Sequence, residues 1–180
     1  MIENSPFCYN RHRVKAIVLG ADPGNFSDHG KAVEIKVAFG IGSGDARYFN
    51  SILKNLNLVG LTLTDIYVQN LISIHPGEET SKFKNWEKFA NRYLPLRIEE
   101  FKEIKPNIPV LVTAERILRY LVNKKLPNAE DIYRNSLYHL IAASENKLNR
   151  PLIPFFRNPK YNLDDDRWFV YRLALNNMFK

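Results

Sequence analysis

The stretch VKAIVLGADPG, residues 14–24, decides the fold. Its first seven residues form a short, predominantly apolar run with β-branched members, which is typical of a buried strand. The run ends in Asp22-Pro23-Gly24. Because proline fixes one backbone angle and glycine permits an unusual one, we expect a stiff turn directly after this strand.

Outward from this strand, the pattern alternates between further strands and helices. Strands are predicted at 65–71, 108–113 and 151–156, and helices at 45–58, 86–104, 114–122, 131–143 and 164–178. Pro151 and Pro154 favour an edge position for the last strand. The alternation predicts one α/β domain over residues 1–180, a three-layer α/β/α fold with a central, mostly parallel four-stranded sheet.

The composition narrows the partners and the compartment. The net charge of the 180 residues is +7 and the pI about 9.5, which favours an anionic partner such as nucleic acid, although a generally basic soluble protein explains the charge equally well. Cys8, the single cysteine, excludes an internal disulfide, a cysteine-based zinc site and a four-thiolate iron–sulfur cluster. No apolar run approaches the roughly 18 residues of a membrane span, and the first residues do not resemble a secretory signal. We therefore expect a cytoplasmic protein without a membrane partner.

Candidate functional residues follow the predicted strands, where open α/β sheets bind their ligands. Asp22 after the first strand offers a carboxylate that orients water or acts as a base. Asn70 after the second offers one acceptor and two donors, enough to read the edge of a base. The loop 157–161 after the fourth holds two cations and Tyr161, suited to phosphates and to stacking. Each motif taken alone also fits an ordinary turn or a solvated loop.

A glycine cluster, residues 40–44, precedes the helix predicted from residue 45. Its backbone N–H groups, including that of Ser43, are suited to holding a phosphate. The spacing is not that of a P-loop, and Ser43 or Asp45 acting as a helix cap is the simpler interpretation.

The order of these motifs resembles the uracil-DNA glycosylase superfamily over roughly residues 14–163. Residues 20–24 resemble the first family motif, a strand that ends in a Gly-x-Asp-Pro or Gly-x-Asn-Pro-Gly turn. Residues 66–71 resemble the strand that ends in the base-reading asparagine, and 93–113 the following helix and third strand. Asn158-Pro159 falls where the family carries its last motif, His-Pro-Ser or Asn-Pro-Ser.

The resemblance implies a role for each matching residue. Asp22 and Asn158 are the expected catalytic residues: Asp22 handles the water that attacks the sugar carbon C1′, and Asn158 holds the departing base or the DNA backbone. Asn70 reads the flipped base, and Phe39 either stacks on it or packs in the core. The remaining expected substrate contacts are Gly20, Ala21, Pro23 and Gly24, and the expected DNA contacts are Ser43, His75, Arg157, Lys160 and Tyr161. No metal or other cofactor is required.

The motifs mix features of several branches of the superfamily. Asn158 stands in place of the histidine of the most active branch, Lys160 in place of the usual serine, and Gly24 in place of a bulky aromatic that excludes thymine. Arg157 is a candidate for the missing positive charge near the leaving base. The expected function is a monomeric, monofunctional DNA glycosylase that hydrolyses the N-glycosidic bond of uracil or a related damaged or mismatched base. The alternatives are a non-catalytic nucleic-acid-binding member of the same fold, and an α/β enzyme acting on a nucleotide or phosphorylated small molecule.

Overall fold

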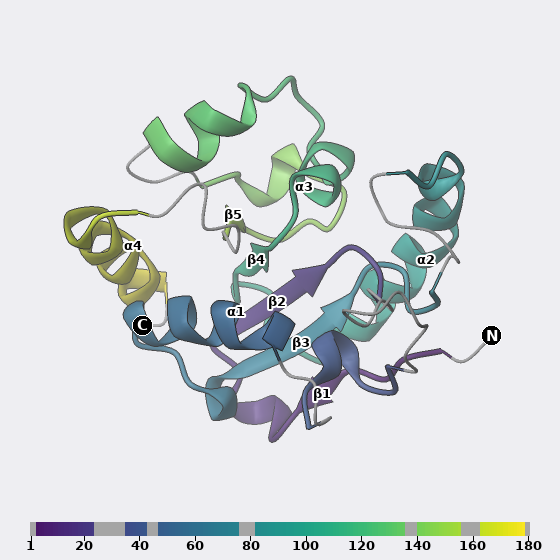
Figure 1. The fold of residues 1–180 in the computed structure, drawn as a ribbon, viewed down its shortest axis with the longest axis horizontal. Coiled ribbons are helices and arrows are strands. Elements are labelled where there is room, and N and C mark those ends of the chain that lie inside the picture. Colours follow the sequence, from purple (N-terminus) through teal and green to yellow (C-terminus); the bar gives the residue numbers. More distant parts are fainter. Residues whose placement is uncertain are drawn as a thin grey trace.

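A five-stranded sheet forms the centre of the protein (Figure 1). The structure, a computed structural model, describes residues 3–23, 35–42, 47–75, 82–135, 140–155 and 163–178. The strands are β1 (Phe7–Cys8), β2 (Ala16–Gly20), β3 (Ile66–Asn70), β4 (Val110–Val112) and β5 (Leu152–Pro154), in the spatial order β1-β3-β2-β4-β5. The expected α/β class with a mostly parallel sheet is therefore confirmed.

The strand pairing places β2 at the centre of the sheet. β2 pairs in parallel with β3 and β4, and β4 pairs in parallel with β5, so β5 lies at an edge as its prolines predict. β1 is antiparallel to β3 and forms the other edge. The predicted number of four strands is wrong by one, because a strand of two residues is too short to show an alternating pattern.

Helices cover both faces of the sheet (Figure 1). Within the described part of the chain, the α-helices are α1 (Arg47–Leu58), α2 (Trp86–Phe101), α3 (Glu115–Leu121) and α4 (Asp165–Met178). Ile17 and Leu19 of β2 pack in one core cluster with α2 and α3, whereas Ala16 and Val18 pack in a second cluster with α1 and α4. Successive residues of a strand point to opposite faces, so the continuous apolar run of β2 supplies both cores.

The helix predicted over residues 131–143 is wrong near its end, where the described residues 140–142 are not helical. Helical structure in the described part of this stretch includes the π-helical turn Asp131–Asn135. Ile141 instead forms an antiparallel bridge with Leu152, with both backbone hydrogen bonds at 2.9 Å. Ile141 thus pairs with the outer edge of β5, and this antiparallel pairing outweighs the local helical pattern.

The described helices are all too short or too polar to cross a lipid bilayer.

Candidate functional site

The first two motifs meet at the carboxyl end of the sheet. Gly20 and Asn70 are Cα partners in the parallel register of β2 and β3. Pairing continues past the strand ends, since the Leu71 N–H donates to Gly20 O at 2.8 Å and the Ile72 N–H to Ala21 O at 3.0 Å. The loops that follow β2 and β3 therefore leave the sheet side by side.

Phe39 completes a cluster with Gly20 and Asn70. A Cβ atom added at Gly20 would lie 2.6 Å from Phe39 Cζ and closer still to Asn70 Oδ1. Both side chains therefore approach the backbone at a position where only glycine fits. Residues 20, 39 and 70, which are far apart in the sequence, form one contiguous site.

The backbone of Phe39 adopts a conformation that is rare for a bulky residue. Its φ is 59° and its ψ 12°, within the 3₁₀ turn Ala38–Gly40. The Ala38 N–H donates to Ser5 O at 2.8 Å, which fixes the start of this turn. Such a conformation costs on the order of 1–3 kcal/mol and occurs preferentially at functional sites.

The ring of Phe39 also belongs to the core. It is 6% exposed and contacts Phe49 edge-on, with ring centroids 6.1 Å apart. The core-packing interpretation of Phe39 is thus confirmed for the body of the ring, while the ring atoms Cζ and Cε2 reach the Gly20 backbone.

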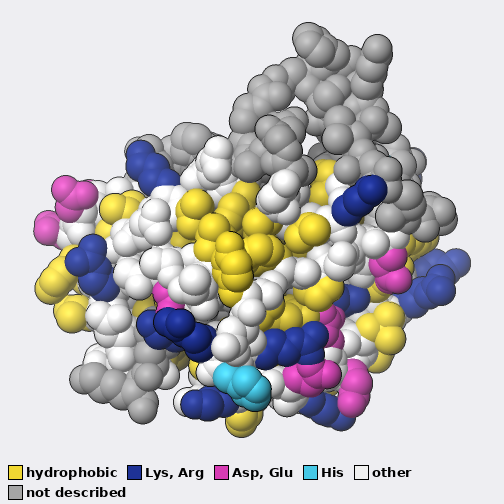
Figure 2. All heavy atoms as spheres, turned by 90° about the horizontal axis from the view of Figure 1, so that it is seen from below, with side chains coloured by type: hydrophobic (Ala, Val, Ile, Leu, Met, Phe, Trp, Pro, Cys, Tyr) yellow, Lys and Arg dark blue, Asp and Glu magenta, His cyan; other side chains and the backbone are white. Residues whose placement is uncertain are grey.

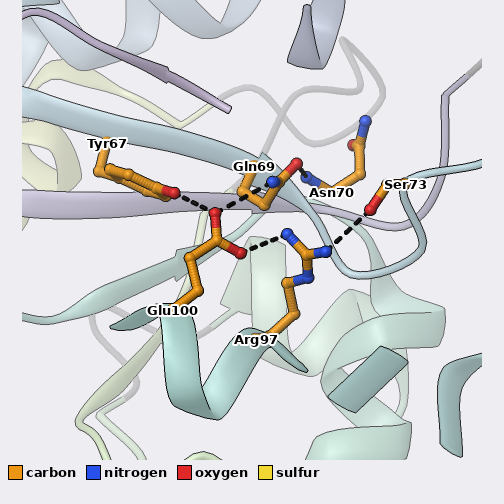
Figure 3. Close-up of polar contacts among 6 residues, drawn as sticks. All are labelled: Tyr67, Gln69, Asn70, Ser73, Arg97 and Glu100. Atoms are coloured by element: carbon orange, nitrogen blue, oxygen red, sulfur yellow. Dashed lines mark hydrogen bonds and ion pairs between the residues drawn. The ribbon is translucent and has the colours of Figure 1, made fainter. Parts of the chain in front are cut away.

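Asn70 carries an unsatisfied donor. The residue is 3% exposed, and its Nδ2 has no hydrogen-bond partner among the described residues. A buried amide without a partner costs about 1–3 kcal/mol. Figure 3 shows the side chain turned away from the polar residues on the α2 side of the sheet. A buried donor without a partner, at the end of an interior strand, is suited to binding a ligand with an acceptor atom.

Asp22 lies two residues beyond Gly20 and is 9% exposed. Its Oδ2 accepts a hydrogen bond from Trp86 Nε1 at 3.1 Å. Trp86, the first residue of α2, is fully buried, and the Arg116 guanidinium lies 5.0 Å from the centre of its ring. The indole N–H thus orients the Asp22 carboxylate. The sequence does not reveal this role of Trp86, because a tryptophan at the start of a helix is equally typical of ordinary core packing.

His75 and Pro23 tie the two loops together. His75 Nδ1 lies 2.9 Å from Pro23 O, which places the expected DNA contact beside the first motif. The side chain of Ala21, another expected substrate contact, packs in the core cluster on the α2 side. The other expected site residues lie outside the described residues: Gly24, Ser43, Arg157, Asn158, Lys160 and Tyr161.

Charges of both signs share the face of the molecule that Figure 2 shows. Lys and Arg side chains lie there together with Asp and Glu side chains, around a central apolar area. Among the described residues no group of three or more His, Cys, Asp or Glu side chains is arranged to hold a metal ion.

No protein-family model matches the sequence, and no curated protein matches it significantly. The function is therefore inferred from the chemistry of the site. Its described part offers a buried amide donor, an aromatic ring tip and an oriented carboxylate, all at or near the end of β2 and β3.

Proposed function

We propose that the protein is a monofunctional DNA glycosylase of the uracil-DNA glycosylase type, which hydrolyses the N-glycosidic bond of uracil or a related damaged or mismatched base. The observation that carries the proposal is the convergence of Phe39 and Asn70 on Gly20, with the Asn70 Nδ2 buried and unpartnered among the described residues. The Asp22 carboxylate, two residues beyond Gly20, supplies the group that handles the attacking water.

A base buried in a duplex must leave the stack before its glycosidic bond is reached. In the proposed complex the Asn70 Nδ2 donates to a carbonyl oxygen on the edge of the flipped base. The tip of the Phe39 ring lies against one side of the same base. The new hydrogen bond from Asn70 Nδ2 to the base recovers the free energy that is lost by burying this donor without a partner. This gain favours binding of the base at this position.

Cleavage of the bond between C1′ and the base nitrogen places positive charge on the sugar and negative charge on the leaving base. The Asp22 carboxylate stabilises the sugar charge and orients the water that adds to C1′. The base departs with the bonding electron pair and takes up a proton from solvent, while the water that adds to C1′ gives a proton to the Asp22 carboxylate, which then releases it to solvent. Trp86 keeps the carboxylate in one orientation throughout, which lowers the reorganisation required in the transition state.

We further propose that the sheet and its helices have the uracil-DNA glycosylase-like α/β/α arrangement, and that the protein acts as a monomer on DNA in cytoplasmic base excision repair. The Phe155 N–H donates to Val112 O at 2.8 Å, so the chain leaves β5 at the carboxyl end of the sheet, where the site also lies. The sequence that follows supplies Arg157, Asn158, Lys160 and Tyr161, whose charges and ring suit phosphates and a leaving base.

The test is single-turnover excision from oligonucleotides that carry uracil, hypoxanthine, xanthine or a G·T mismatch, followed by cleavage of abasic sites. We expect release of at least one base by the wild type. Asp22→Asn, which keeps the shape of the side chain, should lower that rate on the order of 100-fold while DNA binding survives. Asp166→Asn, on an exposed position of α4, is the matched control and should excise at the wild-type rate.

Excision that is unaffected by Asp22→Asn would show that this carboxylate does not handle the water. Salt-sensitive DNA binding without release of any base would instead identify the non-catalytic alternative.

A further inference from the structure

A buried polar network lies on the other side of β3 from the Asn70 side chain (Figure 3). Neighbouring strand residues point to opposite faces, so Gln69 points towards α2 while Asn70 points away from it. Gln69 Nε2 donates to Glu100 Oε1 on α2 at 3.2 Å. The carboxamide of Gln69 is therefore anchored to a helix rather than to solvent.

Glu100 is itself held from two further sides. Its carboxylate accepts hydrogen bonds from the Tyr67 hydroxyl and from Arg97 Nη1. Burial and the adjacent Glu100 carboxylate raise the pKa of Tyr67, so its hydroxyl remains a donor. Arg97 Nη2 also donates to Ser73 Oγ at 2.8 Å, in the loop after β3. Gln69 thus meets a partner whose position is fixed.

The network reaches the backbone of Asn70 through Gln69. The Leu71 N–H points towards β2, where it donates to Gly20 O, so the Asn70 N–H points to the opposite side, towards β1. β1 pairs with Tyr67 and Val68 and begins at Phe7, opposite Val68, so it does not extend to Asn70. Gln69 Oε1 accepts this N–H at 2.8 Å and replaces the missing strand partner.

We propose that Gln69 is a positioning residue, whose carboxamide, clamped by Glu100, holds the Asn70 backbone so that the Asn70 side chain is aimed at the substrate base. This inference rests on the function proposed above. Arg97 adds a second point of attachment, because its bond to Ser73 fixes the loop that continues from Asn70. Asn70, at the end of β3, is thus held in place although β1 does not pair with this part of the strand.

The test compares two variants that each remove one hydrogen bond to Glu100. Gln69→Met keeps a long unbranched side chain but loses the acceptor for Asn70, and should slow single-turnover excision on the order of 100-fold with DNA affinity unchanged. Tyr67→Phe loses a bond in the same network without touching Asn70, and should keep the excision rate within about twofold of the wild type. Equal losses in both variants, or no loss in Gln69→Met, would overturn the inference.

A measurement independent of catalysis separates this inference from the proposed function. In the wild type, NMR should detect a scalar coupling across the hydrogen bond from the Asn70 amide nitrogen to the side-chain carbonyl carbon of Gln69. The Asn70 amide should exchange with solvent roughly tenfold faster in Gln69→Met than in Tyr67→Phe. Absence of the coupling would overturn the positioning role even in a protein that releases bases. Its presence in a protein that releases none would uphold the anchoring of the Asn70 backbone by Gln69 and contradict the proposed function alone.

Discussion

At Gly20 the absence of a side chain leaves room for the side chains of Phe39 and Asn70. Gly20→Ala would force a Cβ against the Phe39 ring and the Asn70 amide. We expect excision to fall at least about tenfold, and the free energy of unfolding to fall by about 1–3 kcal/mol. Single-turnover kinetics and urea unfolding measure the two effects.

Gly60→Ala is the matched control for this change. Gly60 has a left-handed φ of 80°, unlike Gly20, and a Cβ there would meet no atom within 4 Å. The variant should lose stability through backbone strain alone and should excise at the wild-type rate. If Gly20→Ala behaves like Gly60→Ala in both assays, the cluster at Gly20 has no part in the reaction.

The sequence could reveal only those site residues that belong to short motifs beside a predicted strand. Asp22 and Asn70 follow apolar runs, so their place at the strand ends was predictable. Trp86 and Gln69 act through contacts with residues 64 and 31 positions away, to Asp22 and Glu100. No local period encodes such contacts, and only the folded structure reveals them.

At the scale of elements, strand positions were predictable and helix ends less so. The helix predicted over 86–104 ends at Phe101. The buried Arg150 guanidinium accounts for this end, since it donates to the carbonyls of Phe101, Ile104 and Lys105. A cation there also complements the negative end of the helix dipole, and burial lowers its pKa. Its contribution comes from 45 or more residues away, beyond any local signal.

The turn that leads into β3 provides a pH-dependent test. Burial acts to raise the pKa of Asp65, but hydrogen bonds from Thr62 and Lys15 outweigh it and hold the pKa below its usual value. A lowered folded-state pKa stabilises the fold above the unfolded value of about 3.9, and this contribution is lost as the pH falls through the folded value. Asp65→Asn should cost about 1 kcal/mol at pH 7 and progressively less below about pH 4.

Urea unfolding of Asp65→Asn and of the wild type between neutral and acid pH measures this difference. Asp166→Asn, exposed in the first turn of α4, serves as the control without a buried ion pair. A stability difference that stays constant from pH 7 down to strong acid would contradict the account of Asp65.

At the scale of the whole molecule, the net charge of +7 should appear as salt-dependent DNA binding. We expect the affinity for a short duplex to fall steeply between about 50 and 200 mM salt. The double variant Arg157→Ala, Lys160→Ala should reduce the slope of log affinity against log salt by about 1 for each cation removed. Fluorescence anisotropy measures the slope.

Lys102→Ala is the control for this measurement. Lys102 follows the last residue of α2, at the end of the sheet opposite to the site. It forms an ion pair with Glu99 on the surface. Its loss should leave the slope within experimental error of the wild type. An equal slope in all three proteins would place the DNA elsewhere than at the loop after β5.

The same scale shows where prediction from the sequence stops. The alternation of strands and helices predicts a mostly parallel sheet, and Pro151 and Pro154 predict its edge strand. The pairing of β1 with β3 and the bridge of Ile141 to Leu152 each involve very few residues, so no periodicity in the sequence reveals them. They close the two edges of the sheet, a requirement of the whole molecule rather than of any one segment.

The most direct measurement of the central claim is detection of the free base itself. The wild-type protein is incubated with a uracil-containing oligonucleotide, and free uracil is quantified by mass spectrometry alongside abasic sites. The account predicts equal amounts of both products, and loss of both in Asp22→Asn but not in Asp166→Asn. Intact oligonucleotide and no free base, from uracil and from each of the other damaged or mismatched bases, would contradict it.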